Sequence, residues 1–436
     1  MMQIINLTAA EILDSRGNPT IQATVKLNTE LTTTAAVPAG ASTGTHEALE
    51  LRDQDPKRYH GKGVLKAVAN INEQIAPAII GFDPVQQAQI DRVMIELDGS
   101  DHKKNLGANA ILAVSLAVAR AGALAKNQPL YLHLAQLLHP DAAQQPLSLP
   151  IPMMNVLNGG KHALGASDLQ EYMIMPIGAT DLQSAVRWGA EIFHTLGKIL
   201  QKHHHATTVG DEGGYAPQLK SNEAPLKLIL QAIETAGYKP GKQISIALDA
   251  AASEFYQDHH YQFQAEQQVL TTAELINRYA SWTKKYPIVS IEDGLAEDDW
   301  QGFSQLTTQL GERIQIVGDD LFVTHPERLK KGLDLQAANS ILIKPNQIGS
   351  LTETLTTIKL AQNHGFTTII SHRSGETSDP FIADLAVGTN AGQIKTGSLS
   401  RSERIAKYNR LMEIERQLGE QASLAQFGFT AVSDNQ

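Results

Sequence analysis

The chain has 436 residues, of which 36 are Lys or Arg and 46 are Asp or Glu, so its formal net charge at pH 7 is −10. Hydrophobic residues make up 42% and charged residues 19%, a composition that supports a packed core and excludes wholesale disorder. The acidic balance leaves no basic footprint for nucleic acid, so we expect no nucleic-acid partner. The absence of cysteine excludes disulfides, thiolate catalysis and Cys-ligated metal centres, and it fits a reducing compartment.

Residues 1–140 predict a small α+β domain. Residues 4–37 alternate apolar and polar side chains around a turn-forming stretch at 14–19, as in an antiparallel hairpin. Helical patterns follow over residues 64–80 and 105–126. Prolines concentrated between residues 138 and 152 change the composition, so we place a domain boundary near residue 140.

No segment predicts secretion or a membrane span. Residues 1–17 lack a basic region followed by an apolar stretch, which a secretory signal would need. The most apolar segment, residues 108–125, is rich in alanine and carries Asn109, Ser115 and Arg120, so a buried core helix is favoured. We therefore expect a cytoplasmic protein without a membrane span.

The second domain, residues 141–436, contains six short β-rich runs that each end in a polar or charged residue. After a first interval of 43 residues, these ends recur every 23 to 28 residues, close to the roughly 31 residues per strand and helix of an average eightfold α/β barrel. Helices are predicted between the runs, and capping-box pairs open three of them: Thr271 with Glu274, Ser350 with Glu353, and Ser400 with Glu403. This period predicts a parallel α/β barrel whose mouth collects the six ends: Asp249, Glu292, Asp319, Lys344, His372 and Lys395.

Acidic residues occupy one half of the predicted mouth. A single carboxylate at a strand end more often caps a helix or faces solvent than binds a ligand. Asp249, Glu292 and Asp319, however, end successive runs, and converging carboxylates would repel one another unless a cation neutralised them. Because their ligand atoms are all oxygens, the pattern predicts Mg²⁺.

Basic residues occupy the other half. Arg373 with Ser374 offers a forked donor and a hydroxyl suited to a phosphate or carboxylate, and Lys395 offers a second positive contact. Ordinary surface ion pairing is the competing interpretation. Lys344, placed between a metal and other cations, would have its ammonium form disfavoured and could act as a general base.

Two glycine-rich loops carry weaker signals. The GDEGG loop, residues 210–214, is by itself a turn, but beside a metal and a lysine base Glu212 becomes a candidate general acid. The GASTG loop, residues 40–44, is flexible enough for a lid or a phosphate loop.

Long motifs along both domains resemble the enolase family, of the bacterial type. They are DSRGNPT, GASTG, LGANAILAVSLAVA, IPMMNVLNGG, DLQEYMIMP, GDEGGYAP, IEDGLAEDDW, VGDDLFVT, SILIKPNQIG, ISHRSGET and GQIKTGSLSRSERIAKYN. The resemblance implies a C-terminal enolase-type (TIM-like) α/β barrel with an N-terminal α+β capping domain. It also implies a glycolytic enzyme, phosphopyruvate hydratase, which reversibly dehydrates 2-phosphoglycerate to phosphoenolpyruvate.

The same resemblance implies a role for each matching residue and two Mg²⁺ ions per active site. The first ion would be held by Asp249, Glu292 and Asp319, and the second would involve Ser42. Lys344 would remove the C2 proton and Glu212 would protonate the leaving hydroxyl, with Glu171 beside it and His372 near the leaving group. Substrate contacts would come from His162, Gln170, Arg373, Ser374 and Lys395.

Partners and alternatives also follow from the resemblance. It implies a small-molecule substrate and a homo-oligomer, either a dimer or an octamer, and by family likeness alone it allows display at the cell surface. Two alternatives stay open: another acid lyase of the enolase superfamily, and a non-catalytic surface-binding protein on the same fold.

Overall fold

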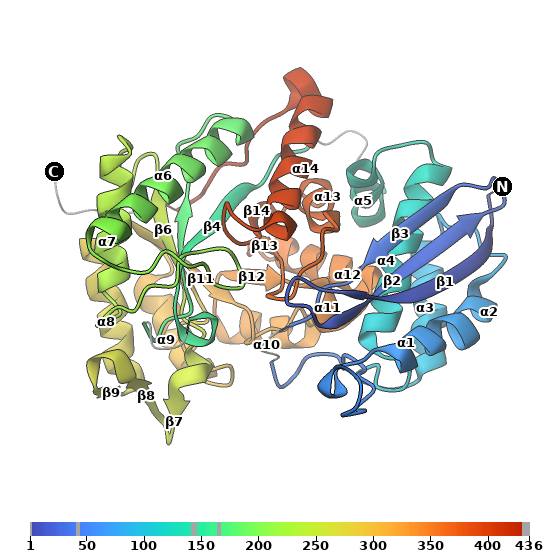
Figure 1. Cartoon of the computed structure of the whole chain (residues 1–436), viewed down its shortest axis with the longest axis horizontal. Coiled ribbons are helices and arrows are strands. Elements are labelled where there is room, and N and C mark those ends of the chain that lie inside the picture. Colours follow the sequence, from blue (N-terminus) through green and yellow to red (C-terminus); the bar gives the residue numbers. More distant parts are fainter. Residues whose placement is uncertain (1, 41–43, 141–145, 164–166, 430–436) are drawn as a thin grey trace.

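The computed structural model describes residues 2–40, 44–140, 146–163 and 167–429. Its N-terminal part begins with a three-stranded antiparallel sheet in the order β1-β2-β3 (Figure 1), formed by β1 Ile4–Leu13, β2 Pro19–Leu27 and β3 Thr32–Ala36. The Asp14 carboxylate accepts the N–H groups of Arg16 and Asn18 and so closes the first turn. The predicted hairpin is therefore confirmed, and a third strand extends it.

Helices cover one face of this sheet. The predicted helix over residues 64–80 is built from three consecutive pieces, α1 Leu65–Asn70, a π-turn at Ile71–Ile75 and α2 Ala76–Ile79. The second predicted helix is α4 Ala108–Ala125, which packs against β2 and β3. Two helices were not predicted, α3 Gln87–Asp98 and α5 Leu130–Leu138.

Helix α4 is the core helix of the N-terminal part. Among the described residues it is the one helix long and apolar enough to cross a membrane, yet 83% of it is buried against the rest of the protein. Burial on nearly all sides explains its apolar composition, because a helix surrounded by packed elements needs no polar face.

The described N-terminal residues before β4 Ile151–Asn158 form what we call the N-terminal layer. Eight further strands close into a barrel beside it (Figure 1). Apolar side chains from the barrel strands, Ile151, Met153, Met173, Ala247, Val289, Val317, Leu342 and Ile369 among them, form a separate buried cluster, so the barrel is packed rather than open. The strands are β4 Ile151–Asn158, β5 Glu171–Met175, β6 Ser245–Asp249, β10 Ile288–Glu292, β11 Gln315–Gly318, β12 Ser340–Ile343, β13 Thr367–Ser371 and β14 Gly392–Lys395.

One strand departs from the predicted parallel order. Strand β5 pairs antiparallel with both β4 and β6, whereas the other neighbouring pairs are parallel. The described residues between β4 and β5 contain no long helix, and the chain returns antiparallel to β4, as in a hairpin. As a result Glu171, the first residue of β5, lies in register with Asp249, the last residue of β6.

Helices surround the barrel, and the hydrogen bonds at their N-termini show whether the three predicted capping-box pairs open helices. Thr271 and Glu274 form a full capping box, and the Ser350 hydroxyl accepts the N–H of Glu353, so these two starts are confirmed. The third is wrong, because Arg401 is the N-cap of α14 and the Ser400 hydroxyl donates instead to the Gly213 carbonyl. The helices are α6 Leu182–Lys202, α7 Ala224–Thr235, α8 Thr272–Lys285, α9 Trp300–Leu310, α10 Pro326–Leu335, α11 Pro345–Ile348, α12 Leu351–Asn363, α13 Phe381–Gly388 and α14 Ser402–Leu418.

Smaller elements fill the connections. A second antiparallel sheet follows β6 and consists of β7 Tyr256–Gln257, β8 His260–Phe263 and β9 Gln268–Leu270. The division near residue 140 stays a prediction, since residues 141–145 lie outside the described ranges.

Asp379 joins the N-terminal layer to the barrel. Its carboxylate accepts the backbone N–H of Ala36 in β3 at 2.9 Å and two guanidinium N–H groups of Arg120 in α4 at 2.8 and 2.6 Å. It also accepts the N–H of Phe381 at the start of α13. One side chain therefore satisfies donors from three elements.

We expect Asp379→Ala to lower the free energy of unfolding by about 2–3 kcal/mol, because it leaves Arg120 without its carboxylate. Urea-induced unfolding measures the loss. Asp334→Ala, which replaces an exposed side chain of α10, is the control. Its free energy of unfolding should stay within about 0.5 kcal/mol of the wild-type value. Equal effects of the two variants would contradict this role for Asp379.

Candidate active site

The polar ends of the barrel strands gather at one rim. Asp249, Glu292 and Lys395 are the last residues of β6, β10 and β14. Asp319, Lys344 and His372 directly follow β11, β12 and β13. Parallel neighbours in register bring these ends together, as Glu292 with Asp249 and Ser371 with Lys395 show.

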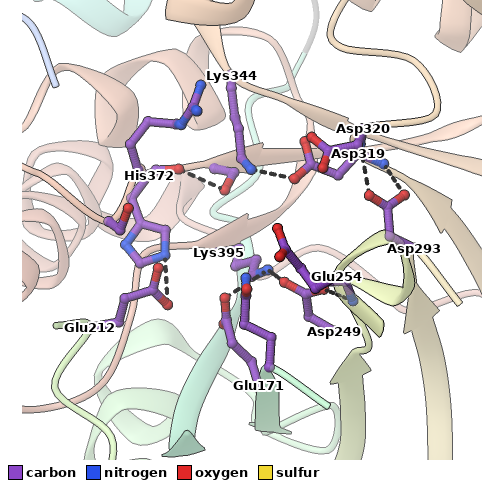
Figure 2. Close-up of a pocket in the computed structure, with 15 residues that line it drawn as sticks. Glu171, Glu212, Asp249, Glu254, Asp293, Asp319, Asp320, Lys344, His372 and Lys395 are labelled. Atoms are coloured by element: carbon purple, nitrogen blue, oxygen red, sulfur yellow. Dashed lines mark hydrogen bonds and ion pairs between the residues drawn. The ribbon is translucent and has the colours of Figure 1, made fainter. Parts of the chain in front are cut away.

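A small cavity opens at this rim (Figure 2). Glu292 lies beneath its lining and reaches the site through Lys395. Ser42 and the side chain of His162 lie outside the described part of the chain. The other residues predicted for the site all line the cavity: Gln170, Glu171, Glu212, Asp249, Asp319, Lys344, His372, Arg373, Ser374 and Lys395.

Lys395 holds the acidic half of the cavity together. Its Nζ donates to Asp249 Oδ2 at 2.8 Å and to both oxygens of Glu292 at 2.8 Å, and lies 3.3 Å from Glu171 Oε1. All four side chains are buried. Burial alone would lower the pKa of Lys395, but the surrounding carboxylates raise it well above its ordinary value, so the ammonium form persists.

Lys344 and Asp319 form a second ion pair across the cavity (Figure 2). Gln347 Nε2 donates to the other oxygen of Asp319 at 2.9 Å. Burial opposes both shifts, yet the pair lowers the pKa of Asp319 and raises that of Lys344. In this arrangement Lys344 is therefore an ammonium ion.

Pro345 positions Lys344 without loss of a hydrogen bond. It is the first residue of α11, where a helix has no partner for a backbone N–H, so a proline costs nothing there. Lys344 keeps the extended geometry that proline favours in its predecessor, and its own N–H donates to Thr324 Oγ1 at 2.9 Å.

Negative charge at the rim exceeds what the two lysines neutralise. Burial, with Glu212 next in importance, raises the pKa of Glu171 well above its ordinary value, and burial with Asp249 does the same for Glu292. Carboxylates that repel one another and offer only oxygen atoms fit a hard divalent cation such as Mg²⁺. The donor set of Asp249, Glu292 and Asp319 is therefore chemically suited to that ion.

A second acidic group includes Asp319 and lines the same cavity (Figure 2). Oxygens of Asp293, Asp319 and Asp320 lie within 4.8 Å of one another. Asp293 accepts the backbone N–H groups of Asp319 and Asp320 at 2.9 and 2.8 Å, so its carboxylate orients this turn. Burial and the Asp319 charge raise the pKa of Asp320 to about 8. Two acidic residues stand side by side in each of the motifs IED (291–293) and GDD (318–320). The sequence therefore already indicated this acidic group, but the sequence analysis did not use it.

Glu212 and His372 face each other on the opposite side of the cavity (Figure 2). Glu212 projects from the 210–214 loop, and His372 Nε2 lies 3.5 Å from its Oε2. Asn155 Nδ2 donates to the same oxygen at 3.1 Å. Burial lowers the pKa of His372 to about 4, so the imidazole is neutral near pH 7.

Arg373 presents its fork to a residue that the sequence analysis missed. Its Nη1 and Nη2 donate to the Glu47 carboxylate at 2.9 and 3.1 Å, and Nη1 also donates to Asn346 Oδ1 at 3.1 Å. Glu47 lies 326 residues away in the N-terminal layer, so no local pattern could have indicated the pair. The fork is thus shaped for a planar oxyanion, and a substrate anion has to share it with Glu47 or replace that carboxylate.

Family comparisons match both parts of the chain. Residues 4–134 match the model of the enolase N-terminal domain, and residues 146–432 match the model of the enolase C-terminal TIM barrel domain. Such domains indicate a lyase of the enolase superfamily, and they generally depend on Mg²⁺. Since the two matches together span most of the sequence, the chain belongs to the enolase family.

Proposed function

We propose that the protein is phosphopyruvate hydratase, which reversibly dehydrates 2-phosphoglycerate to phosphoenolpyruvate. The observation that carries this proposal is the lining of one cavity by Lys344, Glu212 and the Arg373–Ser374 pair. A base, an acid and an anion clamp in one enclosure are what removal of water from a phosphorylated hydroxy acid requires.

The reaction divides between the two halves of the cavity. Lys344 Nζ accepts the C2 proton, and the electron pair of that C–H bond moves toward the substrate carboxylate. Glu212 then donates a proton to the C3 hydroxyl, the C3–O bond breaks with release of water, and a C2–C3 double bond forms. Glu171 assists beside Glu212, and His372 lies near the leaving hydroxyl.

The remaining residues bind the substrate in this proposal. Arg373 and Ser374 hold the phosphate, while Lys395 stabilises the charge that develops after proton removal. Gln170 and His162 complete the contacts by family resemblance. The clamp favours a phosphorylated substrate over the other carboxylic acids used in the superfamily, and a substrate panel distinguishes these cases.

Two Mg²⁺ ions belong to the proposal. Asp249, Glu292 and Asp319 would hold the first, and Ser42 would contribute to the second. Bound there, the ions would offset the carboxylate charges and those of the substrate and, by engaging Asp319, disfavour the ammonium form of Lys344. The need is large, because two unit charges 4 Å apart repel by about 4 kcal/mol at an effective dielectric of about 20.

A glycolytic role, a cytoplasmic location and a homo-oligomer are further parts of the proposal, supported by the family resemblance. The non-catalytic alternative predicts binding without turnover. Measured phosphoenolpyruvate formation from 2-phosphoglycerate by the purified protein therefore separates the two.

Lys344→Ala should strongly slow exchange of the C2 proton, because no other described side chain is assigned to accept it. We expect a loss of roughly 10²–10⁴-fold, the range for general bases, measured by NMR as deuterium incorporation at C2 of 2-phosphoglycerate. Lys359→Ala, which replaces an exposed lysine of α12, is the matched control. Exchange at the wild-type rate in Lys344→Ala would refute the assignment of the base.

Glu212→Gln should separate the two steps. The amide keeps the size of the side chain but cannot donate an acidic proton, so dehydration should fall more than C2 exchange. Paired measurement of exchange and phosphoenolpyruvate formation tests this, with Glu234→Gln on exposed α7 as the control. Equal losses in both activities would argue against Glu212 as the acid.

A further inference from the structure

A buried arginine outside the cavity lining contacts His372 from behind. Arg404 lies in the first turn of α14, and its side chain is fully buried. Its Nη1 lies 2.6 Å from His372 Nδ1 and donates to the Arg373 carbonyl at 2.7 Å. Its Nη2 donates to the carbonyls of Ser374 at 2.6 Å and Asp211 at 3.0 Å.

The chemistry of this contact decides the proton position on His372. A guanidinium carries only N–H donors and no acceptor, so His372 Nδ1 has to present its lone pair to Arg404. The imidazole hydrogen is then on Nε2. A doubly protonated ring would point an N–H group at a cation, which the 2.6 Å separation forbids.

Other charged groups near the ring do not reverse this preference. Glu212 and Glu376 favour the protonated imidazole, whereas burial and Arg404 disfavour it. Burial has the largest effect, and the pKa of His372 falls to about 4. The Nε2–H tautomer is therefore retained across the neutral range.

The tautomer determines which oxygen of Glu212 can carry a proton. His372 Nε2 lies 3.5 Å from Glu212 Oε2, which is too far for a hydrogen bond in this structure but near enough for the Nε2–H group to favour an unprotonated oxygen, and Asn155 Nδ2 donates to the same oxygen at 3.1 Å. The Asn155 amide cannot turn around, because its Nδ2 also donates to Asn158 Oδ1 at 2.6 Å, while Asn158 Nδ2 donates to the Gly214 carbonyl. Because Asn155 donates to Oε2 and the Nε2–H group of His372 lies nearest to that same oxygen, a proton on Glu212 is favoured on Oε1.

We propose that Arg404 is a positioning residue that holds His372 as the Nε2–H tautomer, so that His372 and Asn155 direct the acidic proton of Glu212 to Oε1. The part that concerns proton delivery rests on the proposed function, in which Glu212 is the general acid. The tautomer itself does not depend on that function, since it follows from the contact between Arg404 and His372.

The direct test is ¹⁵N NMR of the full-length protein with ¹⁵N-labelled histidine, with the His372 signal assigned through His372→Gln. We expect a protonated Nε2 and an unprotonated Nδ1 that do not titrate between about pH 5 and pH 9. A wild-type His372 that carries its hydrogen on Nδ1, or that becomes cationic within this range, would overturn the proposal. This reading needs neither substrate nor a variant of Arg404.

Two substitutions test the role of Arg404 in that state. Arg404→Met keeps an unbranched side chain but removes the donors, so His372 should populate the Nδ1–H form or begin to titrate. Arg404→Lys keeps a cationic donor and should restore the Nε2–H signal. An unchanged tautomer in Arg404→Met would show that Arg404 does not set it. If Arg404→Met does not fold, the wild-type and Arg404→Lys spectra still decide the question.

Kinetics then distinguish positioning from simple support of the fold. In Arg404→Met we expect kcat for dehydration to fall roughly tenfold or more, the scale on which orienting residues act, with C2 exchange less affected. The fall should shrink in a His372→Gln background, because Arg404 acts through that ring. A parallel loss of exchange and dehydration, unchanged by His372→Gln, would identify a structural role only. Absence of any phosphoenolpyruvate with wild-type protein would refute the proposed function and leave the NMR result standing.

Discussion

The site depends on one ammonium group buried among carboxylates. Lys395 Nζ contacts Asp249, Glu292 and Glu171, which come from strands β6, β10 and β5. Without that charge, three acids at the rim of a packed barrel would repel one another or take up protons. The ammonium attracts all three carboxylates and opposes the rise that burial causes in the pKa of Glu171 and Glu292. The acids in excess of the lysines make the rim suited to a divalent cation.

Sequence predicted this rim because each strand end combines two local signals. A short buried β-rich run followed by a polar residue marks Asp249, Glu292 and Lys395, and the period of the barrel implies that they meet. The approach failed for β4 and β5, since prolines 150 and 152 marked a boundary and Glu171 begins its strand instead of ending it. Glu47 and Arg404 were missed because tertiary packing alone brings them to Arg373 and His372.

Charge is sorted by position within the cavity. Lys344 and Lys395 are paired with acids of the barrel, whereas Arg373 is paired with Glu47 of the N-terminal layer. His372 stays neutral between Arg404 and Glu212, and so it can orient a proton without adding a charge. The same cavity therefore holds a lysine paired with Asp319, a neutral histidine beside Glu212 and an arginine paired with Glu47 at three separate positions.

The most direct measurement of the central claim is the absorbance of phosphoenolpyruvate formed from 2-phosphoglycerate by the purified protein, recorded before chelation, after EDTA and after renewed addition of Mg²⁺. The account predicts that formation stops with EDTA and returns with Mg²⁺, because the clustered acids need the cation to work with the lysine base. Continued formation in EDTA, or no formation at any Mg²⁺ concentration, would contradict it.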